Sequence, residues 1–155
     1  MDFDNPPDNP FAVFEAWYED AKASEINDPN AMSLATVGAN MQPNLRTVLL
    51  KGHDERGFVF YTNLQSQKGQ ELASNPRAAL NFHWKSLQRQ VRILGPIEPV
   101  SDAEADAYYH SRARESQIGA WASQQSQPIA DRATLERVLQ ETTDKFGNIE
   151  VIPRP

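Results

Sequence analysis

The chain has 155 residues and a formal net charge of −6, with 39% hydrophobic and 23% charged residues. This length suits one domain with a hydrophobic core and is too short for two large ones. The absence of cysteine excludes disulfide scaffolds, thiol catalysis and thiolate metal sites, and three widely spaced histidines argue against an imidazole metal cluster. The acidic balance argues against general binding to nucleic acid or a membrane surface.

The termini and the charge distribution add to this picture. No apolar run approaches the ~20 residues of a bilayer span, and the N-terminal MDFDNPPDNP lacks the basic and apolar parts of a signal peptide. We therefore expect a soluble, cytoplasmic protein. Residues 46–114 hold ten basic and seven acidic residues, whereas the two ends hold five basic and fourteen acidic residues. A basic middle in an acidic chain favours a small anionic ligand, although uneven scatter of surface charge is the alternative.

Residues 1–8 are polar and rich in proline and aspartate, which predicts a flexible tail before a single domain over 9–155. Asn9 and Pro10 are typical of a helix start, and apolar residues recur at helical spacing as far as Ala21. The segment 28–30 ends this helix. Beyond it, the segments 31–37, 44–51, 57–62, 77–84 and 88–100 are β-favouring runs separated by turn signals.

Three further helices are predicted. One spans 66–74 and ends at Asn75-Pro76, a second follows a capping-box pattern at 101–104, and a third runs from about Ile129 to Phe146 with Gly147 as its C-cap. The apolar stripe of the third helix comprises Leu135, Val138, Leu139, Thr142 and Phe146. The fold class is therefore α+β, with an antiparallel sheet closed into a small barrel and helices packed outside it.

Polar residues concentrate in four stretches of this predicted fold. Arg46 and Lys51 bracket the TVLL of one strand, either as anion-binding groups or as strand-end charges that reach water. The segment YTNLQSQK (61–68) leads into a helix, where it would either cradle a phosphate or simply cap the helix with Ser66. Gln90 and Arg92 share one strand face, which would either address a heterocycle's hydrogen-bonding edge or face solvent.

The richest stretch is YYHSRARESQIGAW (108–121), which follows the capping-box helix. Arg112 and Arg114 would repel one another unless an anion lies between them, and a phosphate accepts several guanidinium donors at once. An internal salt bridge with Glu115 is the alternative. Nothing in the sequence indicates a catalytic triad, a nucleophile elbow or a P-loop, so hydrolytic chemistry is not supported.

The segments RTVLLK (46–51), FYTN (60–63), LQRQV (87–91), YHSRARESQIGAW (109–121) and SQQS (123–126) resemble those of pyridoxine (pyridoxamine) 5′-phosphate oxidase. The resemblance runs from about Asn9 to Pro153. It implies a split β-barrel that binds FMN at a homodimer interface. It also implies oxidation of pyridoxamine or pyridoxine 5′-phosphate to pyridoxal 5′-phosphate. In such oxidoreductases, which act on CH–NH2 donors with oxygen as acceptor, a hydride passes to flavin N5 and electrons then pass to O2. The protein orients the two rings.

The resemblance also implies site residues. Those for FMN are Arg46, Val48, Leu49, Leu50, Lys51, Tyr61, Thr62, Lys68, Gln90, Gln125 and Ser126, and those for the substrate are Lys51, Tyr108, Arg112 and Ser116. Arg114 is expected to be structural and paired with a nearby acid. For the homodimer, we expect exposed aromatic surface that includes Phe82, Trp84 and Trp121.

Two departures from the family pattern bear on activity. Gln67 stands where the family has an arginine before the phosphate-binding lysine, which removes one charge-assisted contact. The chain also lacks the Trp-Gly-Gly strand and the Arg-x-His-Asp motif that help to cover flavin and substrate. Two alternatives to the oxidase therefore stay open. One is a split-barrel flavoprotein oxidoreductase with another small substrate, and the other is a non-catalytic module that binds FMN or pyridoxal phosphate.

Overall fold

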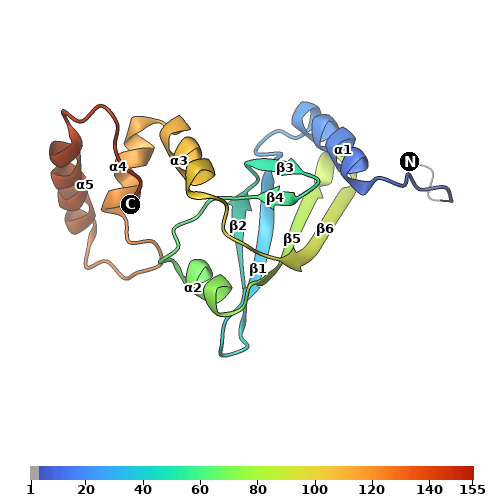
Figure 1. The fold of residues 1–155 in the computed structure, drawn as a ribbon, viewed down its shortest axis with the longest axis horizontal. Coiled ribbons are helices and arrows are strands. Elements are labelled where there is room, and N and C mark those ends of the chain that lie inside the picture. Colours follow the sequence, from blue (N-terminus) through green and yellow to red (C-terminus); the bar gives the residue numbers. More distant parts are fainter. Residues whose placement is uncertain (1–3) are drawn as a thin grey trace. The chain divides into compact units, whose positions relative to one another are not determined.

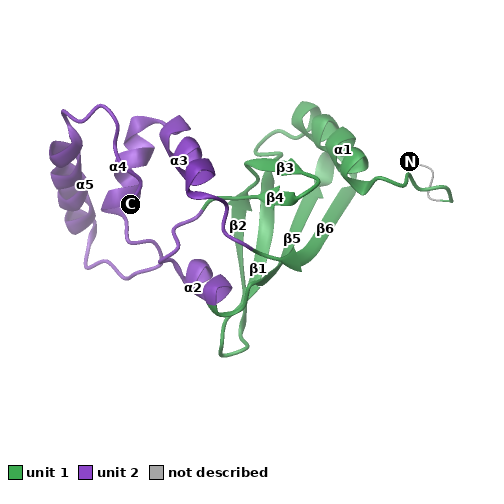
Figure 2. Cartoon of the chain, viewed as in Figure 1, with its two compact units in different colours: residues 1–61, 74–97 green, residues 62–73, 98–155 purple. Residues whose placement is uncertain are grey.

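The computed structural model describes residues 4–155, which divide into two compact units (Figure 2). Unit 1 comprises residues up to 61 together with 74–97, and unit 2 comprises 62–73 and 98–155. The predicted N-terminal tail lies partly outside the described residues, in its positions 1–3. Its positions 4–8 are exposed and form neither helix nor strand.

Five α-helices, six strands and one short 3₁₀-helix make up the described chain (Figure 1). Unit 1 holds α1 (Pro10–Ser24), β1 (Ala31–Val37), β2 (Pro43–Leu49), β3 (Gly52–Asp54), β4 (Gly57–Val59), β5 (Arg77–Trp84), the 3₁₀-helix Lys85–Leu87 and β6 (Arg89–Pro96). Unit 2 holds nearly all of α2 (Gln67–Ser74) and all of α3 (Asp102–Ser111), α4 (Arg114–Ala122) and α5 (Arg132–Phe146).

Helix α1 begins where the sequence predicts. The Oδ1 of Asn9 accepts hydrogen bonds from the backbone N–H groups of Phe11 and Ala12, and Pro10 occupies the first helical turn, where its missing N–H costs nothing. Phe14 and Ala21 are buried on the inner side of the helix. The predicted start and apolar face of α1 are therefore confirmed.

The strands form antiparallel sheets. One sheet has four strands in the order β2-β1-β5-β6, and β3 and β4 form a separate two-stranded hairpin. Leu34 of β1 lies opposite both Arg46 of β2 and Leu80 of β5. The predicted strand over 57–62 is wrong beyond Val59, because residues 60–62 leave the hairpin without further pairing.

The strand alternation decides which sheet face is covered. Leu34, Phe82 and Trp84 lie on the face that α1 covers, and the Phe14 ring centroid is 5.3 Å from that of Phe82 and 5.8 Å from that of Trp84. Phe82 and Trp84 are 0% and 2% exposed, and the Trp84 indole Nε1–H donates to the carbonyl of Pro29 at 2.8 Å. The expectation that these two aromatic residues provide dimer surface is therefore wrong, since both are buried in the core of unit 1.

Unit 2 is built around a second small core of Tyr109, Ile118, Phe146 and Ile152, against which Trp121 packs. Helix α4 lies within the polar stretch around residues 108–121, for which the sequence predicts no second helix. Its N-cap is Ala113, which makes no side-chain capping bond, so the usual start signal is missing from the sequence. Phe146 is buried as predicted.

The N-terminus of α5 differs from the prediction. The helix starts at Arg132, three residues later than predicted, because Asp131 is its N-cap. Leu135 and Leu139 of the predicted stripe remain 41% and 42% exposed. None of the helices in residues 4–155 is long and apolar enough to cross a membrane.

Candidate functional site

Arg46 lies on the inner face of β2, where its guanidinium is held by oxygen atoms. Its Nη1 donates to the hydroxyl of Thr36 and, at 3.3 Å, to the carbonyl of Leu34. Thr36 is itself buried, with 2% of its surface exposed. The side chain is therefore fixed by its own sheet and does not extend freely into solvent, as a strand-end charge would.

The residues that follow Arg46 differ in burial, because some lie on either face of β2 and others lie beyond its end. Val48 packs against the core, Leu49 is 38% exposed and Leu50 is 3% exposed. Lys51 lies just beyond the strand with its side chain exposed, while its backbone N–H donates to the carbonyl of Val59 at 2.8 Å. Tyr61, half-buried, ends this part of unit 1.

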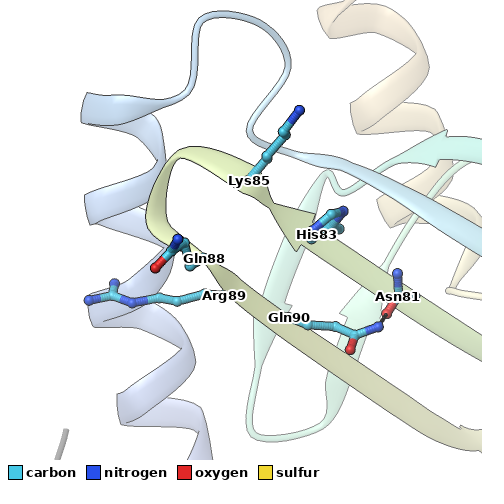
Figure 3. A pocket seen from close by; sticks show the side chains of 6 residues that line it. All are labelled: Asn81, His83, Lys85, Gln88, Arg89 and Gln90. Carbon is cyan, nitrogen blue, oxygen red and sulfur yellow. Dashed lines mark hydrogen bonds between the residues drawn. The ribbon is translucent and has the colours of Figure 1, made fainter.

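Gln90 lies on the face of the four-stranded sheet that α1 leaves open. Its amide Nε2 donates to Asn81 Oδ1 across the β5–β6 ladder at 2.7 Å (Figure 3). His83 is the direct cross-strand partner of Gln90. Gln90, Asn81 and His83 help to line a shallow polar pocket. Its lining residues are Asn81, His83, Lys85, Gln88, Arg89 and Gln90. Its amides supply both donors and acceptors, which suits the edge of a polar heterocycle.

A buried lysine marks the start of α2 in unit 2. Lys68 is only 9% exposed, and its Nζ donates to Gln125 Oε1 at 2.7 Å and to Ser66 Oγ at 3.4 Å. The hydroxyl of Thr62 donates to the same Gln125 oxygen at 3.3 Å. Two neighbouring predicted residues, Thr62 and Lys68, are thus brought together with the distant Gln125 at a helix N-terminus, a kind of place that is suited to binding phosphate.

Two neighbouring details shape this helix start. A Cβ on Gly69 would overlap the backbone of Leu64, so the chain approaches closely here and only glycine fits. Gln67 Nε2 donates to the carboxylate of Glu71 at 3.0 Å, and Glu71 is 8% exposed. Gln67 is therefore occupied along its own helix.

Ser126 adopts a left-handed backbone with φ of 68°. Such a conformation is uncommon for a residue other than glycine and is often found at functional sites. It follows Gln125 directly, so the turn that presents the Gln125 amide to Lys68 has an unusual backbone.

The predicted substrate residues Tyr108, Arg112 and Ser116 surround the turn between α3 and α4. Arg112 is the C-cap of α3, with an extended backbone at φ −77° and ψ 152°. Tyr108 and Arg112 are half-buried, and Ser116 is exposed in the first turn of α4. Arg114 is the first residue of α4.

Arg114 has a structural role, but its partners differ from those expected. Its Nη2 donates to the carbonyls of Phe146 at 2.6 Å and Ile149 at 2.9 Å, and approaches the carbonyl of Gly147 at 3.5 Å. These carbonyls belong to the last residue of α5 and to the segment that follows it, and the Phe146 carbonyl also accepts from the Ile149 N–H at 3.0 Å. Arg114 is therefore held by backbone oxygens, where the expectation was a nearby acid.

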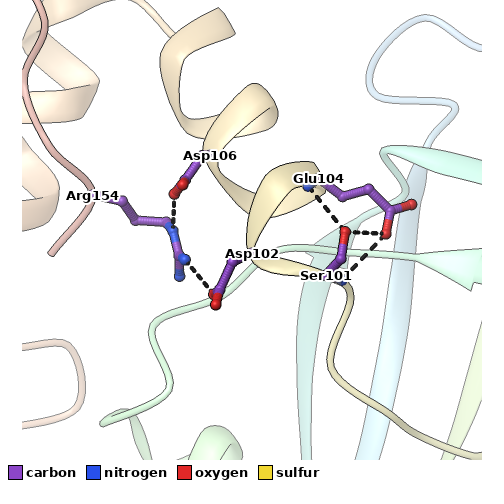
Figure 4. Close-up of polar contacts among 5 residues, drawn as sticks. All are labelled: Ser101, Asp102, Glu104, Asp106 and Arg154. Atoms are coloured by element: carbon purple, nitrogen blue, oxygen red, sulfur yellow. Dashed lines mark hydrogen bonds and ion pairs between the residues drawn. The ribbon is translucent and has the colours of Figure 1, made fainter.

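Helix α3 is also fixed at its start. Ser101 and Glu104 form the predicted capping box, and Arg154 donates to Asp106 Oδ1 at 2.6 Å and to Asp102 Oδ1 at 2.7 Å (Figure 4). The carboxylate neighbours raise the pKa of Arg154 through hydrogen bonds, first from Asp106. These contacts hold the helix that carries Tyr108.

Three residues that hold predicted site residues in place were not predicted from the sequence: Thr36 at Arg46, Asn81 at Gln90, and Gln117 next to Arg112. Strand register is a signal that could have found Asn81, because it lies one pair from Gln90 on the same face. Nothing in the sequence pairs Gln117 with the turn. Among residues 4–155, no group of three histidine, aspartate or glutamate side chains could hold a metal ion.

Comparison with known proteins places this geometry in a family. Residues 18–146 match the family described as pyridoxamine 5′-phosphate oxidase. The chain is 62% identical over 148 residues to a pyridoxine/pyridoxamine 5′-phosphate oxidase of Caulobacter vibrioides, covering 96% of this chain and 66% of that protein. It is also 62% identical over 146 residues to the enzyme of the same name from Agrobacterium fabrum, covering 94% and 70%. The chain thus spans about two thirds of the length of these relatives.

Solved structures agree with this assignment. PhzG from Burkholderia lata, in complex with tetrahydrophenazine-1-carboxylic acid, is 28% identical with a TM-score of 0.89 over 98% of this chain and 74% of that one. A pyridoxamine 5′-phosphate oxidase-related, FMN binding protein from Nostoc punctiforme shares the fold at 19% identity, with a TM-score of 0.64 over 84% and 73%. The chain therefore belongs to the pyridoxamine 5′-phosphate oxidase family, with that family's antiparallel split β-barrel and flanking helices.

Proposed function

We propose that the chain binds FMN and oxidises pyridoxamine or pyridoxine 5′-phosphate to pyridoxal 5′-phosphate, with O2 as the electron acceptor. The observation that carries the proposal is the buried ammonium of Lys68 at the start of α2, together with the hydroxyls of Ser66 and Thr62 and the amide of Gln125. A buried cation beside hydroxyl donors is suited to a phosphate monoester, which FMN carries.

The residues fit FMN in each unit taken by itself. In unit 2, Thr62, Lys68, Gln125 and Ser126 would contribute donors to its phosphate and polar groups. In unit 1, Arg46 offers a guanidinium already oriented by Thr36, and the amide of Gln90 offers hydrogen bonds to a ring edge. The remaining FMN candidates are Val48, Leu49, Leu50, Lys51 and Tyr61. When bound, FMN would supply the two-electron redox chemistry that no side chain here provides.

In unit 2, Tyr108, Arg112 and Ser116 would hold the substrate, chiefly at its phosphate, and in unit 1 the candidate for substrate binding is Lys51. Arg112 lies between α3 and α4, as the C-cap of α3 with an extended backbone. A guanidinium and hydroxyls recognise phosphate geometry better than a lone ammonium does. The reaction would remove two electrons and two protons at C4′, and their transfer to O2 would yield hydrogen peroxide. The alcohol substrate would give the aldehyde directly, whereas the amine substrate would give an imine that water hydrolyses to the aldehyde with release of ammonia.

A specific observation favours a second candidate. PhzG is 28% identical and matches this chain with a TM-score of 0.89, and its bound ligand is a tetrahydrophenazine carboxylic acid. The alternative is therefore a split-barrel flavoprotein oxidoreductase whose small substrate carries a carboxylate in place of a phosphate. A non-catalytic module that binds FMN or pyridoxal phosphate is the third possibility.

We also propose a homodimer, on residues other than the buried Phe82 and Trp84. The face of the four-stranded sheet opposite α1 exposes Leu45 by 69%, Leu49 by 38% and Leu94 by 71%. Ala31, Ser33 and Ala35 of β1, which pair with Leu49, Thr47 and Leu45, give this face a small-residue centre. A second copy of the chain would remove these leucines from water.

The test is an absorption spectrum of the purified protein after incubation with FMN and removal of the excess. We expect a flavin spectrum that stays with the protein, and peroxide release when pyridoxamine 5′-phosphate is added in air. A protein that keeps FMN but turns over only a non-phosphorylated carboxylate substrate supports the second candidate. A protein that retains no flavin refutes FMN-dependent oxidation by this chain.

A further inference from the structure

The side chain of Gln117 in α4 reaches back to the turn that carries Arg112. Its Nε2 donates to the carbonyl of Arg112 at 2.8 Å and, more weakly, to the carbonyl of His110 at 3.4 Å. These carbonyls belong to the end of α3, where backbone acceptors have no partner within the helix. Gln117 therefore caps α3 from the following helix.

The orientation of this amide is determined chemically. Both partners are carbonyl oxygens, which only accept hydrogen bonds, so the nitrogen end of the amide must face them. Exchanging the amide oxygen and nitrogen would place oxygen against oxygen. The Gln117 Nε2 group thus donates to the carbonyls at both ends of the segment 110–112.

The backbone of Gln117 is fixed as well. The hydroxyl of Tyr109 donates to the Gln117 carbonyl at 2.9 Å, and Tyr109 is 4% exposed. Burial raises the pKa of Tyr109, so its hydroxyl stays protonated and keeps this donor role at neutral pH. The Gln117 N–H donates to the carbonyl of Ala113 at 3.1 Å. Arg112 therefore lies in a turn whose two sides are linked by hydrogen bonds in both directions.

We propose that Gln117 is a positioning residue that holds the backbone of Arg112 so that its guanidinium meets the phosphate of the substrate. This inference rests on the proposed function and deepens it. A guanidinium that binds phosphate through two parallel bonds needs a defined direction, and misplacement by about 1 Å weakens such a site markedly. Gln117 does not touch the phosphate itself in this assignment, because its amide is occupied by the turn.

The test compares Gln117→Met with Gln140→Met in the full chain loaded with FMN. Methionine keeps the length and the helix propensity of glutamine and removes both donors. Gln140 is the matched control, since it is a glutamine of α5 that bonds only along its own helix, to Asp144 at 2.9 Å. The ligands are pyridoxal 5′-phosphate and pyridoxal, titrated by absorbance, with the Kd for FMN measured separately.

We expect Gln117→Met to lower the affinity for pyridoxal 5′-phosphate by about 3- to 10-fold. This is the size of effect expected when about one net hydrogen bond is lost. Pyridoxal binding, the Kd for FMN and the Gln140→Met variant should change by less than about 2-fold. A general loss of structure would instead weaken both pyridoxal compounds. In the Arg112→Ala background, Gln117→Met should add little further loss, because its effect passes through Arg112.

Equal weakening of pyridoxal and its phosphate, or full additivity with Arg112→Ala, overturns the positioning role. If Gln117→Met does not fold, Gln117→Asn takes its place, since it keeps the amide but is one methylene too short to reach the turn. Unchanged phosphate preference in that variant also overturns the inference. Should the wild-type chain show no preference for pyridoxal 5′-phosphate over pyridoxal, the proposed substrate fails, and the positioning role fails with it. A wild-type preference lost in Arg112→Ala but kept in the Gln117 variants refutes the inference alone.

Discussion

Replacing Arg114 by alanine should destabilise unit 2 without affecting FMN binding. Arg114 ties the start of α4 to the carbonyls of Phe146 and Ile149 through bonds of 2.6 and 2.9 Å. A hydrogen bond to a charged group contributes about 1.5–3 kcal/mol, and a cation near a helix C-terminus adds about 0.3–1 kcal/mol. Because Arg114 is only half-buried, water replaces part of this. We expect a total loss of about 2–3 kcal/mol.

Urea denaturation followed by far-UV circular dichroism and tryptophan fluorescence measures this loss. The corresponding drop in Tm is about 4–12 °C for a chain of this size. Arg132→Ala is the control, because Arg132 is 90% exposed and pairs with Glu136 along α5, a contact that contributes about 0.3–0.5 kcal/mol. A loss below about 1 kcal/mol for Arg114→Ala, or one equal to that of the control, would refute the argument that carbonyl contacts of Arg114 hold unit 2 together.

Four further predictions follow from the described contacts. Arg46→Ala should lower FMN affinity about 10- to 100-fold in a fluorescence titration, whereas Arg56→Ala, on an exposed turn, should not. Arg112→Ala should raise the KM for the phosphorylated substrate more than it lowers kcat; an unaltered KM would place the substrate elsewhere. Leu94→Lys should convert a dimer to a monomer in light scattering, and a wild-type monomer with FMN bound contradicts the homodimer. Hydrogen bonds from Thr134 lower the pKa of Asp131, so Asp131→Ala should destabilise α5 at pH 7, with the difference from wild type shrinking as the pH falls below about 3.9.

The placement of the helices and strands shows where local signals suffice. Asn9 and Pro10 indicate the start of α1, and the Ser101 capping box indicates the start of α3. Both helices begin where these signals predict. Helix α4 was not predicted, because Ala113 gives no capping signal and because the pair Arg112 and Arg114 indicated an anion site. Helix-forming residues after Arg114 carried more weight than that charge pattern.

The candidate site divides in the same way. The residue types of the site are legible in the sequence, and the resemblance to the family names them one by one. Their partners are not, because Lys68 and Gln125 are 57 positions apart and Arg114 and Phe146 are 32 apart. No spacing rule connects side chains across such separations. Gln117 is a local case that was missed, since its five-residue reach to Arg112 exists only once α3 and α4 have formed.

Local propensity and turn signals in the sequence were enough to predict the α+β class and five of the six strands, whereas the short strand β3 was not predicted. Tertiary structure alone decided what each face meets. Packing of α1 turned the aromatic residues of β5 into core and left Leu45 and Leu94 on the open face. It also decided which oxygens the basic side chains donate to, because a guanidinium or ammonium donates to any correctly placed oxygen and only the folded backbone sets that place.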